Sequence, residues 1–280
     1  MNWLSYSLLC AFSLASADAF TKWRLSGHST RELVFLRFAG PGLLLSPFLA
    51  QLPVLQPEFW IWVSCAIPLE FAAMFLYMEA IRLSPLHLTL PFLAFSPAFS
   101  AIFAYFLLGE RIAAPGLAGI ALVVLGALWL GRGRMADPFR AILSEQGSRL
   151  MLMVAMLYGM TSVLGKGALQ YCPPLEFGAL YFALLGALSL PALFYRKPGG
   201  KLFRKPLWAL AVGIMVSLMV VFHFLAISLA KVSYMIAVKR TSLLFGILYG
   251  ALLFREKGLG LHLAAGTVMV LGVALIAFGG

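Results

Sequence analysis

The chain has 280 residues, of which 62% are hydrophobic and 11% charged, and its mean hydropathy is +0.96. This composition excludes a soluble globular domain and indicates an all-α protein that crosses a membrane several times. The net charge of +11 does not indicate nucleic-acid binding, because the basic residues lie in short gaps between apolar stretches, where cytoplasmic loops collect them. The three cysteines form neither a disulfide framework nor a metal-binding spacing.

The hydropathy pattern predicts ten transmembrane helices. The first five cover residues 3–20, 33–50, 59–81, 86–108 and 115–130, and the last five cover residues 150–169, 175–195, 207–230, 234–254 and 259–278. The first span resembles a signal peptide but lacks the basic residues that normally precede one, so we expect it to be retained. The predicted organisation is a first repeat over residues 1–131, a linker over 132–149 and a second repeat over 150–280.

The two halves resemble each other in sequence. Glu110-Arg111 and Glu256-Lys257 each follow a long apolar span, and each is followed by sixteen residues that lead to a matching Leu-Gly pair. Lys22 in the first half similarly matches Lys166 in the second. Because each half holds an odd number of spans, the second enters the membrane from the opposite side, which is the inverted-repeat architecture of transporters.

Most lysines and arginines lie in the gaps after the first, third, fifth, seventh and ninth spans. The gaps on the other side hold only Arg111, Lys166 and Lys231. The positive-inside rule therefore predicts a cytoplasmic linker and two external termini in a multi-pass protein of the cytoplasmic (inner) membrane.

Lys239 and Arg240 are the candidates for the centre of a binding site. They stand about six residues inside the ninth span, roughly 9 Å below the surface at the helical rise per residue. Charges at such depth are costly and mark functional sites by default, although Lys239 could also reach back to the interface. Arg240 is the stronger candidate, because a guanidinium binds a carboxylate or phosphate through two hydrogen bonds.

Glu70 lies near the middle of the third span, where a carboxylate must be paired or protonated. We consider a countercharge to Arg240 or Lys239, a proton-coupling site, and a static hydrogen bond between helices. His223, Tyr77 and Tyr234 are further candidates for substrate contacts, with ordinary packing as the alternative for His223.

Three charged residues are expected at the cytoplasmic ends of the second and third spans. Arg37, Glu79 and Arg82 form the predicted cytoplasmic gate, and Glu79 and Arg82 lie one helical turn apart and can pair.

The motif LLGER at Leu107–Arg111, the sequence PGLAGIALVVLGALWL after it and the echo LLFREK at Leu252–Lys257 resemble the EamA domain of the drug/metabolite transporter superfamily. The resemblance covers nearly the whole chain. It implies a transporter whose central cavity is enclosed by the third, fourth, eighth and ninth spans, for substrates ranging from amino acids and amines to nucleotide sugars. In the first repeat Leu93-Ala94 stands in place of Lys239-Arg240.

The sequence thus predicts a secondary transporter for a small anionic or zwitterionic metabolite, working by alternating access. The alternatives are an exporter of cationic amines or drugs that uses Glu70 as its binding carboxylate, and a flippase for an anionic lipid or a structural membrane subunit. No enzyme motif, cofactor or metal site is predicted. The glycines in the fifth and tenth spans fit either helix packing within the chain or the face of a homodimer.

Overall fold

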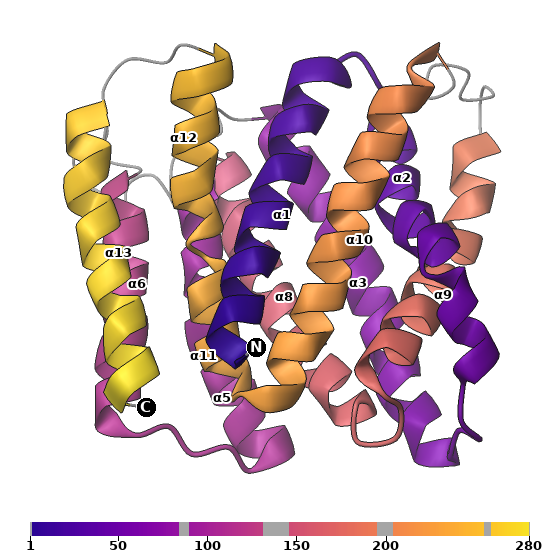
Figure 1. Ribbon diagram of the computed structural model, residues 1–280, viewed down its shortest axis with the longest axis horizontal. Coiled ribbons are helices and arrows are strands. Elements are labelled where there is room, and N and C mark those ends of the chain that lie inside the picture. The colour runs from indigo at the N-terminus through magenta and orange to yellow at the C-terminus, as the bar shows by residue number, and fades with distance from the viewer. Residues whose placement is uncertain (1, 84–89, 131–145, 195–203, 255–258, 280) are drawn as a thin grey trace.

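The computed structural model describes residues 2–83, 90–130, 146–194, 204–254 and 259–279, and its regular elements are helices standing side by side in a bundle (Figure 1). The first half contains α1 (Trp3–Arg24), α2 (Thr30–Leu44), η1 (Ser46–Gln51), α3 (Pro57–Leu83), η2 (Leu90–Phe95), α5 (Ser96–Leu108) and α6 (Ala114–Leu130). The second contains α8 (Gln146–Ala168), α9 (Pro174–Phe194), α10 (Pro206–Leu229), α11 (Val232–Lys239), α12 (Ser242–Phe254) and α13 (Leu259–Gly279).

The apolar character of the helices is that of a membrane protein. Seven helical segments in the described part are long and apolar enough to cross a membrane, and two shorter apolar helices cover Ala114–Trp129 and Ala264–Gly279. The prediction of an all-helical, multi-pass membrane protein is therefore confirmed.

Local sequence signals set several helix ends. The Asn2 side chain accepts a hydrogen bond from the amide of Ser5 at 3.0 Å and so caps α1. Ser29 and Glu32 form a reciprocal capping box at the start of α2. Gly109 ends α5 with a left-handed φ of 68°, a conformation that glycine adopts at little cost.

Helices of one half pack mainly on helices of the other. The most extensive contacts join α3 to α8, α6 to α13, α1 to α10 and α2 to α9. If the halves are exchanged, so that α1 matches α8 and α3 matches α10, this set of contacts maps onto itself. Most of the buried surface therefore lies between the two halves.

Two of the predicted continuous spans are interrupted. The ninth span breaks between α11 and α12, at Arg240 and Thr241. There the backbone hydrogen bonds span three residues instead of four, from the amide of Thr241 to the carbonyl of Val238 and from the amide of Leu244 to the carbonyl of Thr241. The Thr241 hydroxyl also bonds back to the Val238 carbonyl at 2.8 Å and competes with the regular helix. The fourth span changes from η2 to α5 at the corresponding place, just before Pro97.

Glycines let α6 and α13 approach closely. A Cβ atom added to Gly119 would lie 2.7 Å from the carbonyl oxygen of Gly272, and one added to Gly272 would lie 2.7 Å from that of Gly119. These glycines therefore serve helix packing within the chain.

Replacing Gly119 with leucine should destabilise the protein by about 3 kcal/mol, at the upper end of overpacking costs, because backbone rather than a flexible side chain stands in the way. The same substitution at Gly246, where an added Cβ meets nothing within 4 Å, is the matched control and should change little. Thermal unfolding of the detergent-purified variants measures the difference. Equal melting temperatures for the two variants would contradict this packing.

Candidate functional site

The break in the ninth span faces the corresponding break in the fourth. Arg240 is 6% exposed, and its Nε donates a hydrogen bond of 2.9 Å to the hydroxyl of Ser96, the first residue of α5. Irregular backbone inside a membrane is tolerated only where protein or an aqueous cavity surrounds it. The contact therefore places a guanidinium between the two irregular segments.

The terminal nitrogens of Arg240 have no hydrogen-bond partner among the described residues, because its one hydrogen bond there uses Nε. The Nζ atom of Lys239 lies 3.4 Å from Nδ1 of His223 on α10. Within the described part of the chain, neither cation has a carboxylate at ion-pair distance. The structure thus brings three of the predicted site residues together, and among the described residues no carboxylate forms an ion pair with either cation.

Glu70 lies beside a different residue. The Thr161 side chain on α8 is close to the Glu70 carboxylate on α3, and Lys239 lies within electrostatic reach of that carboxylate. Glu70 is half-buried. The carboxylate and the cations therefore share one region.

Tyrosines complete the polar region. Tyr77 on α3 is buried and lies within electrostatic reach of Arg240. Tyr158 on α8 and Tyr181 on α9 lie within electrostatic reach of Glu70, and the buried hydroxyl of Tyr181 has no hydrogen-bond partner among the described residues. A buried hydroxyl without a partner is costly, so Tyr181 can donate to a bound molecule or water.

Sequence reasoning missed Ser96, Thr161, Tyr158 and Tyr181. Of these, only Ser96 carried a detectable signal: the repeat alignment that pairs Glu110 with Glu256 also pairs Ser96 with Ser242, beside the cations.

Tyr234 is not part of this group. Its ring packs on Gly116, where an added Cβ would lie 2.2 Å from the tyrosine oxygen, within a cluster that includes Ile120 and Met269. The predicted role of Tyr234 as a substrate contact therefore receives no support from its position.

The predicted gate residues Arg37, Glu79 and Arg82 lie in different surroundings. Arg37 is buried on α2 and forms an ion pair with Asp18 on α1, a partner that the sequence analysis did not assign. Glu79 lies partly buried on α3, and the side chain of Arg82 falls outside the described residues. An ion pair thus joins α1 to α2.

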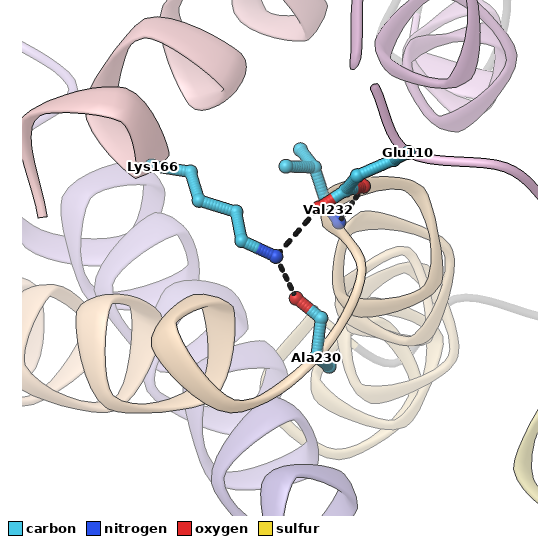
Figure 2. A network of polar contacts seen from close by, with 4 residues as sticks. All are labelled: Glu110, Lys166, Ala230 and Val232. Atoms are coloured by element: carbon cyan, nitrogen blue, oxygen red, sulfur yellow. Dashed lines mark hydrogen bonds and ion pairs between the residues drawn. The ribbon is translucent and has the colours of Figure 1, made fainter. Parts of the chain in front are cut away.

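A second polar network lies where the connection between α5 and α6 meets α8 and α11 (Figure 2). The Glu110 carboxylate accepts hydrogen bonds from Lys166 Nζ at 2.6 Å and from the Val232 amide at 2.9 Å. Lys166 Nζ also donates to the carbonyl oxygen of Ala230 at 2.6 Å. One carboxylate from the first half therefore binds two groups of the second, and one of these, Lys166, also binds the Ala230 carbonyl.

The model of the EamA-like transporter family matches residues 1–132 and again 146–278. The chain belongs to the EamA-like transporter family. As a member of that family, the protein is a membrane transporter, and its polar region between the broken helices is the candidate substrate site.

A search of solved structures places this EamA-like protein near one described only as "Crystal structure of protein", with a TM-score of 0.76 and 21% sequence identity. The match covers 98% of this chain and 95% of the other, and at that identity it shows the fold alone. No curated protein matches the chain in sequence.

Removing Asp18 should destabilise the protein more than removing both members of its ion pair. Asp18→Asn leaves the Arg37 guanidinium buried without a countercharge, at an expected cost of about 2 kcal/mol, reduced from that of a fully buried pair because the Asp18 side chain is 38% exposed. Asp18→Asn combined with Arg37→Gln removes the stranded charge and should recover part of the loss. Thermal unfolding of the single and double variants tests this, and a double variant less stable than Asp18→Asn would contradict it.

Proposed function

We propose that this EamA-like transporter moves a small anionic or zwitterionic metabolite by alternating access. The observation that carries the proposal is the buried Arg240 at the helix break, with its terminal nitrogens unpartnered in the described part of the chain. A carboxylate or phosphate can accept two parallel hydrogen bonds from such a group. Lys239 adds a second positive charge, so an anion relieves a charge imbalance when it binds.

Glu70 gives the cycle an exchangeable negative charge. In this proposal it balances Lys239 electrostatically while the site is empty and takes up a proton or changes partner when the substrate anion arrives. The nearby Thr161 hydroxyl supports this role, because a hydroxyl can orient the carboxylate without neutralising it. For a zwitterion, the same carboxylate would bind the cationic end.

The second candidate function is export of a cationic amine or drug. One observation favours it: Glu70 lies among the tyrosines of α8 and α9, and aromatic rings around a carboxylate suit a cation. The adjacent positive pair of Lys239 and Arg240 opposes it.

We further propose that all ten apolar segments cross the cytoplasmic membrane as two inverted repeats, with the termini outside. The chain ends and the connection between α5 and α6 lie at one end of the bundle, and the connection between α1 and α2 lies at the other (Figure 1). The basic residues Lys22, Arg204 and Lys205 belong to that second end, which therefore suits the cytoplasm. The homodimer stays a prediction, and its face would lie away from the glycines buried between α6 and α13.

Anions should raise the thermal stability of the purified protein, and Arg240→Gln should abolish that effect. At a ligand concentration one hundred times its dissociation constant the expected stabilisation is ~2.7 kcal/mol. Arg149→Gln is the matched control, because Arg149 is exposed at the start of α8 and should retain the response. The screen compares carboxylates, phosphates, neutral amino acids and quaternary amines. Stabilisation by amines alone, lost in Glu70→Gln, would overturn the anion proposal in favour of the amine exporter.

The proposed orientation is tested by thiol labelling of intact cells. In a background without Cys10, Cys65 and Cys172, a membrane-impermeant maleimide should label Arg111→Cys, between α5 and α6, and leave Gly27→Cys, between α1 and α2, unlabelled until the cells are opened. Both positions are exposed, so access depends on which side they face. The reverse labelling pattern would place the termini in the cytoplasm.

A further inference from the structure

We propose that Glu110 and Lys166 form a clamp that closes the external end of the site and positions α11. We call the network of Glu110, Lys166, Ala230 and Val232 the Glu110 clamp (Figure 2). The inference rests on the proposed transport function, and its test measures conformation rather than transport.

The clamp satisfies two backbone groups that helix ends leave without partners. Ala230 follows α10 in an extended conformation, and its carbonyl accepts from Lys166. Val232 begins α11, and its amide donates to Glu110. A cation at the carboxyl end of a helix and an anion at the amino end also complement the two helix dipoles. The turn between α10 and α11 is thus held from both sides.

The clamp connects the two halves at a point that controls the site. Glu110 belongs to the connection between α5 and α6, whereas the other three members of the clamp belong to the second half. Helix α11 starts at the clamp and ends at Lys239, so the position of its first turn affects where the cationic pair lies. Any movement that opens this end between α5 and α11 must break the bonds to Glu110.

The ion pair of the clamp is partly shielded from water. The side chains of Lys166 and Glu110 are 23% and 11% exposed, so the pair is largely screened from water, unlike an ordinary surface ion pair. Val232, a member of the clamp, and the next residue, Ser233, are fully buried. In this proposal, water or a solute that enters from this end passes the clamp first.

Ser233 provides a reporter for opening. Its hydroxyl is buried and has no hydrogen-bond partner in the described part of the chain, so Ser233→Cys changes little in the closed state. Labelling of this thiol by a water-soluble maleimide then measures how often the first turn of α11 becomes accessible. Reconstitution into lipid nanodiscs exposes both faces, which makes the result independent of membrane orientation.

In the background without native cysteines, Glu110→Gln should raise the labelling rate at position 233 about tenfold, because the amide can still accept from Val232 but loses the charge-assisted bond to Lys166. Lys166→Met should have a similar effect. The two together should add little to either alone, since both remove the same contact.

Two controls separate opening from general loosening. Glu58→Gln makes the same chemical change at an exposed residue at the start of α3 and should leave the rate unchanged. A thiol introduced by Ser189→Cys, buried in the last turns of α9, should not become more reactive in Glu110→Gln. An unchanged rate at position 233, or equal increases at positions 233 and 189, would overturn the clamp. Neither result would alter anion binding by Arg240, which the thermal-shift screen measures separately.

Discussion

The hydrogen bond between Arg240 and Ser96 joins two places where a membrane-embedded helix is interrupted. In a lipid environment, backbone groups released by such interruptions must find partners inside the protein. At the break in the ninth span, the amides of Thr241 and Leu244 meet this requirement locally by bonding to the carbonyls of Val238 and Thr241. The two breaks face each other through Arg240 and Ser96, and the polar side chains of His223, Lys239 and Glu70 lie in the same region.

The charges of that region are distributed unevenly. Arg37 pairs with Asp18, but the described side-chain hydrogen-bond partners of Lys239 and Arg240 are the neutral groups of His223 and Ser96. Isolated buried charges are costly, whereas neutral hydrogen-bond partners offset only part of that cost. A substrate anion can supply the missing negative charge, so we expect the stability of the occupied state to depend on the charge of the substrate.

The sequence predicted Lys239, Arg240, Glu70 and His223 because ionisable residues stand out against apolar spans. It could not indicate Thr161, Tyr158 or Tyr181, since hydroxyl-bearing residues are frequent in such helices and only tertiary packing decides which face they occupy. Helix geometry alone gives a reason to doubt that Tyr234 contacts the same substrate as Lys239. At 100° per residue, the two side chains lie about 140° apart around the helix. The break at Thr241 was also missed, because hydropathy averages over a window and does not register a local change in hydrogen bonding.

The similarity of the halves separates architecture from specificity. Gly126 and Gly272 match between the repeats and serve equivalent contacts, since an added Cβ would lie 2.9 Å from the Ala265 carbonyl oxygen at Gly126 and 2.7 Å from the Gly119 carbonyl oxygen at Gly272. The cationic pair has no such match, since Leu93 and Ala94 occupy the equivalent positions next to Ser96. A symmetric scaffold needs no charge at either break in order to fold. A charged residue that occurs at one break only is therefore a candidate for substrate binding. Arg240 is the clearest case, because its buried guanidinium is costly without a ligand.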